Sequence, residues 1–286
     1  VLITDQNYED LALERALFDD AGAELVVAQC TSEDEVLTAG REFDAFLVQY
    51  APVTGRALAQ LPRLGIISRI GAGYTIDTAA CAKYGVWLAN SPDYGVGEVA
   101  THALALALAS IRNIVAYDRD VHAGTWHFLS SGTLRRPADL VLGIVGLGRI
   151  GKRMAHVSRD VFRRVVAFDP YLIDGDFPAY VERARTLEAL AGVADVVSLH
   201  TPLNAETRGL VGAAFFAAAR RGLTLVNTSR AAVVSMPDLL AALDAGILRG
   251  AALDVLPVAP LPADSPLRRD ARVIASLPDI KVPSLV

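Results

Sequence analysis

The sequence lacks the features that mark several classes of protein. Among its 286 residues are only two cysteines, Cys30 and Cys81, which argues against a disulfide framework and favours ordinary buried thiols. No group of His, Cys, Asp or Glu has the spacing of metal ligands, so no metal is expected. The net charge is −5 and the arginines are scattered, a pattern that argues against nucleic-acid contact.

Long apolar runs are missing as well. The longest, around residues 102–111, is too short to span a bilayer, and no signal-peptide pattern is visible at residues 1–3. We therefore expect no membrane contact and a cytoplasmic location. What the chain does have is apolar content, 52% of 286 residues, which is enough to bury a large core and to form two domains.

The most informative stretch is Leu140–Gly151, which reads LVLGIVGLGRIG. Its apolar first half predicts a buried parallel strand, and the GxGxxG pattern that follows leads into a predicted helix over residues 150–162. Gly146 makes the tight turn, Gly148 lets the backbone approach a pyrophosphate, and Gly151 lets the helix pack closely on the strand. The first N–H groups of the helix then face the phosphates. By itself, however, a glycine-rich turn of this kind can also simply connect a strand to a helix without binding a ligand.

A carboxylate follows the next predicted strand, over residues 165–168. Asp169 lies 18 residues after Gly151. At that place a carboxylate accepts hydrogen bonds from both ribose hydroxyls of NAD and repels a 2′-phosphate. Pro170 and Tyr171 come next, with no Arg nearby to receive that phosphate. The pattern therefore predicts NAD(H) as the cofactor and not NADP(H).

Short predicted strands alternate with helices along the chain, which predicts an α/β protein. The first part of the chain has predicted strands at 1–4, 24–28, 43–49, 64–68 and 86–89, with an amphipathic helix over 8–20. The second part has six predicted strands, at 140–145, 165–168, 195–199, 223–227, 251–254 and 273–275. We predict a smaller flavodoxin-like substrate domain over residues 1–94, joined by the tail 277–286, with the turn formers at 90–95 as a hinge. A Rossmann-type, doubly wound NAD-binding domain is predicted over residues 95–276.

Two further helices and one irregular segment complete the pattern. An apolar helix is predicted over residues 97–117, buried between domains or subunits. Another is predicted over residues 236–245, with Ser235 as its N-cap and Gly246 at its end. The segment 118–139 is irregular and aromatic, and it fits either dimer packing or the rim of a substrate pocket.

Polar side chains follow four of the later strands where each strand ends. They are Asp169, His200 with Thr201, the run Thr228–Arg230, and Asp254. In such sheets ligands bind beyond the carboxyl ends of the strands, so we expect these side chains to line one site.

Together these stretches resemble the NAD-dependent D-2-hydroxyacid dehydrogenases, over nearly the whole chain. The matching segments are Arg69–Tyr74 with Ile76 and Asp77, Gly143–Gly151, Val197–Leu203, Asn227–Arg230 and Gly250–Val255. Details such as RIGAGY and FDPYLIDG are most similar to the branch that holds the C-terminal-binding-protein corepressors. The resemblance implies hydride transfer between the nicotinamide and C2 of a small 2-oxo or 2-hydroxy acid, in the cleft between the domains of a homodimer.

The resemblance also implies roles for single residues. Arg230 is implied to be the catalytic residue that binds the substrate carboxylate and carbonyl, because its planar fork suits such oxygens. Backbone N–H groups at Ala72 and Gly73 are implied to hold the same carboxylate, and Asp254 to meet the nicotinamide carboxamide. The implied cofactor-binding residues are Gly146, Gly148, Arg149, Ile150, Gly151, Asp169, Pro170, Tyr171, His200, Thr201, Pro202, Thr207, Thr228, Ser229, Arg230 and Asp254.

The sequence departs from the family at the acid–base pair. The family's Glu precedes a Pro soon after the strand that ends before Asp254, and Ala259 stands at that place. The family's His follows a Pro after the next strand, where Asp279 stands nearest. His102 and His200 match structural or cofactor-flanking positions, so we expect hydrogen-bonded histidines there and no acid–base role.

Three interpretations remain open at this stage. The chain is a dehydrogenase with a truncated or altered tail, a variant whose proton donor is Asp279, Tyr50 or water, or a non-catalytic NAD(H)-binding sensor or regulatory protein. Ala231 in place of the usual Gly, and Ser235 in place of an acidic residue, add to the departure. We predict a dehydrogenase that interconverts a small 2-oxo acid and its D-2-hydroxy acid.

Overall fold

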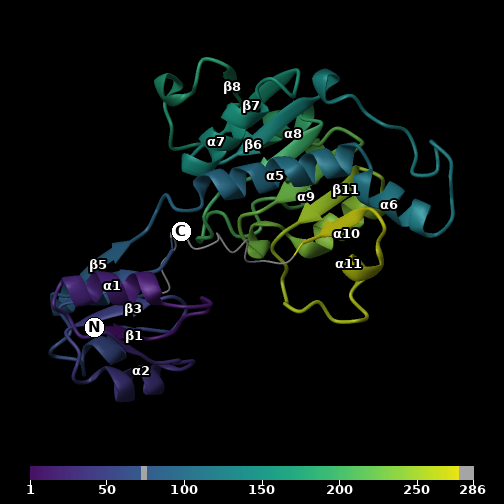
Figure 1. Cartoon of the computed structure of the whole chain (residues 1–286). Helices are drawn as coiled ribbons and strands as arrows, with labels where there is room; N and C mark the ends of the chain where they lie inside the picture. The colour runs from purple at the N-terminus through teal and green to yellow at the C-terminus, as the bar shows by residue number, and fades with distance from the viewer. Residues whose placement is uncertain (72–75, 277–286) are drawn as a thin grey trace. The chain divides into compact units, whose positions relative to one another are not determined.

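A computed structural model describes residues 1–71 and 76–276 of the chain. The chain divides into one compact unit over Val1–Gly95 and a second that starts at Val96 (Figure 1). Each unit is built on its own parallel sheet with helices packed against it. The predicted α/β class with two sheets is confirmed.

The smaller unit holds a five-stranded sheet in the order β2-β1-β3-β4-β5, the order of flavodoxin-like folds. Its strands lie where the sequence predicted them, and its core gathers buried side chains such as Phe46, Val48 and Ile67. The elements are β1 (Leu2–Ile3), α1 (Ala12–Asp20), β2 (Val26–Val27), α2 (Glu33–Gly40), β3 (Ala45–Val48), α3 (Gly55–Leu58), β4 (Ile66–Arg69), α4 (Thr78–Tyr84) and β5 (Trp87–Asn90).

Helix α1 differs from its prediction at its start and in its burial. It begins at Ala12 because the Asp10 carboxylate accepts a hydrogen bond from the Ala12 N–H, 2.9 Å away, and so fixes the first turn. None of its side chains is fully buried, and Leu13 and Leu17 are exposed. The apolar face of the predicted amphipathic helix is therefore only partly buried.

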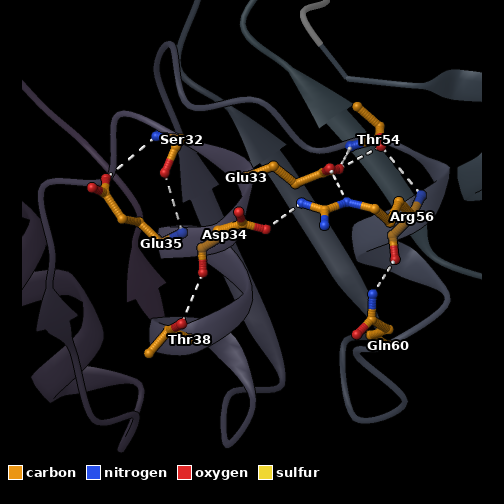
Figure 2. A network of polar contacts seen from close by, with 8 residues as sticks. All are labelled: Ser32, Glu33, Asp34, Glu35, Thr38, Thr54, Arg56 and Gln60. Carbon is orange, nitrogen blue, oxygen red and sulfur yellow. Dashed lines mark hydrogen bonds and ion pairs between the residues drawn. The ribbon is translucent and has the colours of Figure 1, made fainter.

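A polar network joins α2 to α3, as Figure 2 shows. Ser32 and Glu35 form a capping box at the start of α2, which satisfies two free backbone N–H groups. Glu33 accepts hydrogen bonds from the backbone and hydroxyl of Thr54 and from Arg56 Nε. These donors lower the pKa of Glu33 to about 2. The network fixes the packing of two helices that are too short to hold their places alone.

The larger unit holds a seven-stranded parallel sheet in the order β12-β11-β10-β9-β6-β7-β8. The chain reverses its direction of winding between β6 and β9, which is the ligand-binding point of doubly wound sheets. The strands are β6 (Val141–Val145), β7 (Arg164–Phe168), β8 (Val181–Arg183), β9 (Val196–Leu199), β10 (Leu223–Asn227), β11 (Leu248–Leu253) and β12 (Val273–Ala275). The helices and 3-10 turns are α5 (Val96–Ile111), α6 (Ile114–His122), η1 (Pro137–Asp139), α7 (Arg149–Ser158), η2 (Asp174–Asp176), α8 (Leu187–Val193), α9 (Ala213–Ala218), η3 (Ala231–Val233), α10 (Met236–Asp244) and α11 (Pro266–Arg269).

The prediction of six strands in this part of the chain is wrong by one. The additional strand, β8, lies at the sheet edge and pairs with β7 through Val165 and Val181. Only its first residue is buried, and Glu182 is exposed. An edge strand with one apolar position gives no apolar run, so the sequence pattern did not indicate it.

The prediction of one helix over residues 97–117 is also wrong. Asn113 adopts a left-handed conformation with φ of 54°, which ends α5 and starts α6 at a bend of 58°. Asn tolerates this conformation better than most residues. No single helix of the described residues is long and apolar enough to cross a membrane; α5 and α6 reach that length only as a bent pair.

Helix α5 lies across one face of the seven-stranded sheet in Figure 1. Its buried residues Ala100, Ala103 and Ala107 belong to the same core cluster as Ile144 and Met154. The apolar composition of this helix predicted burial between domains or subunits. Many of its apolar side chains instead pack against the sheet of the same unit. Small Ala side chains let α5 approach the strands and α7 closely.

Candidate cofactor and active site

The glycine turn after β6 has the geometry that its sequence predicts. Gly146 has φ of 88°, and a Cβ there would lie 2.9 Å from the His200 carbonyl oxygen. A Cβ on Gly151 would lie 2.1 Å from the Gly146 carbonyl oxygen, so only glycine lets α7 pack this closely. Nothing lies within 4 Å of a Cβ built on Gly148. The turn is thus closed toward the protein and open at Gly148, and α7 begins at the next residue, Arg149.

Asp169 is fixed beside this turn by two backbone groups. Its Oδ2 accepts a hydrogen bond from the Leu147 N–H at 2.9 Å, and its Oδ1 accepts one from the Tyr171 N–H at 3.0 Å. Each carboxylate oxygen keeps a further acceptor site for a ligand hydroxyl. The hydroxyl of the same Tyr171 donates a hydrogen bond to the Glu206 carboxylate, and this bond raises the pKa of Tyr171.

Two buried hydroxyl groups at the same edge have no partner within the described part of the chain. They belong to Thr201, two residues after β9, and Thr228, one residue after β10. The two strands are neighbours in the sheet, and Asn227 is opposite Leu199. Buried polar atoms are nearly always hydrogen-bonded, so a bound ligand is the natural source of these missing partners. Together with the open glycine turn and Asp169, these residues fit NAD(H).

The turn that carries Arg230 is held by Asn227, the last residue of β10. Asn227 Oδ1 accepts hydrogen bonds from the Ser229 N–H at 3.0 Å and from its hydroxyl at 2.8 Å. Asn227 Nδ2 donates to the Arg230 carbonyl oxygen at 3.0 Å. The Arg230 side chain itself is exposed, and its Nη1 donates to the Ser229 carbonyl oxygen. In the sequence, Asn227 belongs to a segment that matches the family but has no predicted role. Its position directly before a turn indicates that its side chain can hydrogen-bond the turn's backbone.

A His–Asp–Ser cluster lies at the ends of β11 and β12. Ser276 Oγ donates to Asp254 Oδ1 at 2.6 Å, and His102 Nε2 lies 3.2 Å from the same oxygen. His102 comes from α5, so three separate segments meet at one carboxylate. Asp254 is thereby oriented, and His102 is hydrogen-bonded as expected. Ser276 was missed because nothing in its local sequence indicates this contact.

His200 and Thr207 are used within the protein. His200 Nε2 lies 2.9 Å from Ser198 Oγ, and burial lowers the pKa of His200 to about 4, so the ring is neutral near pH 7. Thr207 Oγ1 donates to the Pro202 carbonyl oxygen at 2.6 Å, which shapes the loop after β9. Both residues lie after β9 at the carboxyl edge of the sheet, and their role in binding the cofactor stays a prediction.

The other candidate residues lie outside the described part of the larger unit. Ala72, Gly73 and Asp279 lie outside the described residues. Tyr50 belongs to the smaller unit, where its N–H donates to Asp5 Oδ2 at 2.6 Å. Ala259 is exposed and brings no carboxylate to the loop after β11.

Fold and edge geometry define a dinucleotide-binding protein of the doubly wound class. The sequence model of the D-isomer specific 2-hydroxyacid dehydrogenase NAD-binding domain matches residues 104–276. The chain belongs to this family, and the prediction of NAD(H) is confirmed at the level of the family's NAD-binding domain.

Relatives and solved structures agree with this family. The chain is 36% identical to D-3-phosphoglycerate dehydrogenase of Mycobacterium tuberculosis over 246 residues, 85% of this chain and 46% of that protein. It is 33% identical to glyoxylate reductase of Korarchaeum cryptofilum, over 78% of this chain and 68% of that protein. D-mandelate dehydrogenase of Rhodotorula graminis is similar in structure, with a TM-score of 0.84, 29% identity and coverage of 96% and 86%. The chain spans about half the length of the phosphoglycerate dehydrogenases it matches.

Proposed function

We propose that the protein is an NAD(H)-dependent oxidoreductase that interconverts a small 2-oxo acid and its D-2-hydroxy acid. The observation that carries this proposal is the Arg230 turn. A guanidinium is presented by a turn that Asn227 fixes, at the same sheet edge as the glycine turn and the Thr228 hydroxyl. An Arg fork beside a nicotinamide-binding edge suits a carboxylate next to a carbonyl.

In this proposal the chain's own residues bind and orient. Asp169 receives the ribose hydroxyls, the first N–H groups of α7 receive the pyrophosphate, and Asp254 receives the carboxamide. Arg230 holds the substrate carboxylate and polarises the carbonyl that is reduced. Bound NADH supplies the hydride, and each reduction also takes up one proton. Asp279, Tyr50 and water remain the candidate sources of that proton, because Asp279 stands nearest the place of the family's proton-donating His and Ala259 replaces the Glu that orients it.

The named relatives indicate which substrates to test. One is called a glyoxylate reductase and another a D-3-phosphoglycerate dehydrogenase. The panel is therefore glyoxylate, pyruvate, a longer-chain 2-oxo acid and the 2-oxo acid that corresponds to 3-phosphoglycerate. NADH oxidation is followed by its absorbance, and NADH binding is titrated in parallel.

The two readouts separate the candidate functions. Steady-state turnover of any panel member supports the dehydrogenase. NADH binding without turnover of any member overturns it and supports the alternative, an NAD(H)-binding sensor or regulatory protein of the same fold. Absence of both activities contradicts each of them.

We also propose a homodimer, with the segment after α6 as its contact. Figure 1 shows this loop leaving the body of the larger unit, and its aromatic residues Trp126 and Phe128 are 88% and 76% exposed. Exposed apolar groups of this size in one segment favour a protein contact. Replacing Trp126 by Ser is expected to shift the chain toward monomer in sedimentation, with NADH binding kept. The cytoplasmic location expected from the sequence stays a prediction.

A further inference from the structure

A second candidate site lies at the amino edge of the seven-stranded sheet, where its strands begin. A cavity of about 360 Å³ lies there beside the corner between α5 and α6. Cavities of this volume are large enough for a small organic ligand. The glycine turn after β6, where the cofactor is expected, lies at the opposite, carboxyl edge of the sheet. The cavity is therefore distinct from the cofactor site. Side chains relevant to a ligand are those of Ser110, Asn113, Arg119, Thr224, Arg249 and Arg272.

The cavity is strongly positive. Three arginines line it, and none of the described residues in its wall is acidic. Arg272 is compensated by Asp270, with Nη2 and Oδ2 2.6 Å apart. Arg119 and Arg249 form no ion pair with a residue in the described ranges 1–71 and 76–276. Asp120, beside Arg119, is already bound by the Ser131 hydroxyl at 2.7 Å.

Arg249 is fixed with donors to spare. Its Nη2 donates to Asn113 Oδ1 at 3.0 Å and to the Thr133 carbonyl oxygen at 2.7 Å. Its Nε and Nη1 make no hydrogen bond to a described residue. Burial, and to a smaller extent the nearby Arg135, lowers the pKa of Arg249.

Two other groups at the cavity complete the donor set. Arg119 donates from Nη2 to the Ala271 carbonyl oxygen at 3.1 Å and from Nε to the Val115 carbonyl oxygen, which leaves Nη1 without a partner in the described chain. Ser110 has a buried hydroxyl that makes no hydrogen bond within that same part of the chain. Arg272 is paired with a carboxylate, so a structural role is sufficient to explain it. The unused N–H groups of Arg119 and Arg249 and the Ser110 hydroxyl have no such explanation.

We propose that this cavity binds a small organic oxyanion, a carboxylate or a phosphate ester, through Arg119 and Arg249. Guanidinium groups bind both kinds of oxyanion by charge-assisted hydrogen bonds. Because the cavity and the cofactor turn lie at opposite edges of one sheet, such a ligand and NAD(H) bind at the same time.

Titration calorimetry on the full chain tests this, with citrate and inorganic phosphate as probes. Ionic strength is held constant with NaCl, and saturating NADH occupies the cofactor turn. We expect saturable binding of one probe or both. Arg249→Gln and Arg119→Gln are each expected to weaken it roughly tenfold or more. Arg41→Gln removes an equal charge from an exposed position in the smaller unit and is expected to change nothing.

The outcomes divide cleanly. Binding of citrate alone identifies a carboxylate ligand and binding of phosphate alone a phosphate ester, and either supports the site. No saturable binding of either probe overturns the proposal, and so does binding that both cavity variants leave unchanged. Arg119 is exposed, so its variant carries the test if Arg249→Gln fails to fold. The readout is binding and not turnover, so the result is independent of the proposed reaction.

Discussion

Two carboxylates at opposite edges of the seven-stranded sheet, Asp195 and Asp169, are used in different ways. At the amino edge the carboxylates are consumed by the protein: Asp195 accepts hydrogen bonds from the Val141 N–H at 2.9 Å and from Arg135 at 2.5 Å. At the carboxyl edge Asp169 binds only backbone N–H groups and keeps acceptor sites free. Asp195 therefore holds the fold at one edge, and Asp169 keeps acceptor sites for a ligand at the other.

The arginines do not follow this contrast. At the carboxyl edge Arg230 is exposed on a fixed turn, and at the amino edge Arg249 keeps unused donors inside a cavity. Under the two proposals both edges therefore bind anionic groups through arginine, and the carboxyl edge adds a carboxylate, Asp169, that accepts hydrogen bonds from ligand hydroxyls. Five substitutions or titrations break or sharpen this comparison.

The largest effect is expected from Arg230→Ala, which removes the cation of the carboxyl edge. Loss of a bidentate contact to a carboxylate is expected to lower kcat/KM for the 2-oxo acid roughly a thousandfold. NADH affinity is expected to stay close to that of the wild type, as titration would show. Arg230→Lys keeps the charge without the fork and should recover only part of the rate. An unchanged rate in the Ala variant would remove Arg230 from the reaction.

Asp195→Ala tests the structural use of acid at the amino edge. Its side chain is 7% exposed, and removing it leaves Arg135 without its partner. Breaking a buried pair of this kind is expected to cost about 3 kcal/mol of unfolding free energy in urea titrations. Asp244→Ala is the control, because this carboxylate is 82% exposed and its ion pair with Arg272 contributes under about 1 kcal/mol. Equal losses in both variants would contradict the assignment.

The neutral His200 makes stability depend on pH. Its pKa falls from 6.5 to about 4 on folding, so the unfolded chain binds more protons between these values. The free energy of unfolding is therefore expected to fall by about 3 kcal/mol as pH drops from 6.5 to 4. His200→Gln cannot titrate and should flatten this slope. Glu33 acts mainly at lower pH, between its ordinary pKa of 4.5 and about 2, so its loss of stability overlaps that of His200 only near pH 4 to 4.5.

Gly151→Ala and Gly148→Ala form a matched pair in the glycine turn. An added Cβ at Gly151 would meet the Gly146 carbonyl oxygen at 2.1 Å, which is expected to cost about 2 kcal/mol of stability. At Gly148 the same methyl group enters open space, so unfolding should be unchanged. NADH affinity should nevertheless fall in Gly148→Ala, because the methyl group occupies the approach to the pyrophosphate. A stable Gly148→Ala protein with full NADH affinity would contradict this.

The smallest effect is expected from Asp169→Ala, about a tenfold loss of NADH affinity with weaker discrimination against NADPH. Asp169→Asn keeps one acceptor oxygen and removes the negative charge, so it separates ribose binding from repulsion of a 2′-phosphate. Affinities for both cofactors are measured for the wild type and the two variants. If the NADH-to-NADPH ratio is the same in all three, Asp169 does not contact the ribose.

The sequence was most informative where function and local conformation require the same residue. Gly146, Gly151 and Asp169 follow a buried strand at fixed spacing, so motif and strand pattern together placed the carboxyl edge. The break at Asn113 and the edge strand β8 were missed because one left-handed residue or one buried position changes no periodicity. The network around Asp254 joins His102 and Ser276, 174 residues apart, and no local pattern indicates such a contact. The cavity arginines are likewise scattered along the chain.

Helix α5 contributes residues to both edges of the seven-stranded sheet. His102, near its first turns, contacts the carboxyl-edge Asp254, and Ser110, near its end, lines the amino-edge cavity. At 1.5 Å per residue these positions are about 12 Å apart along one continuous helix. The Asp254 cluster and the cavity therefore share one continuous helix.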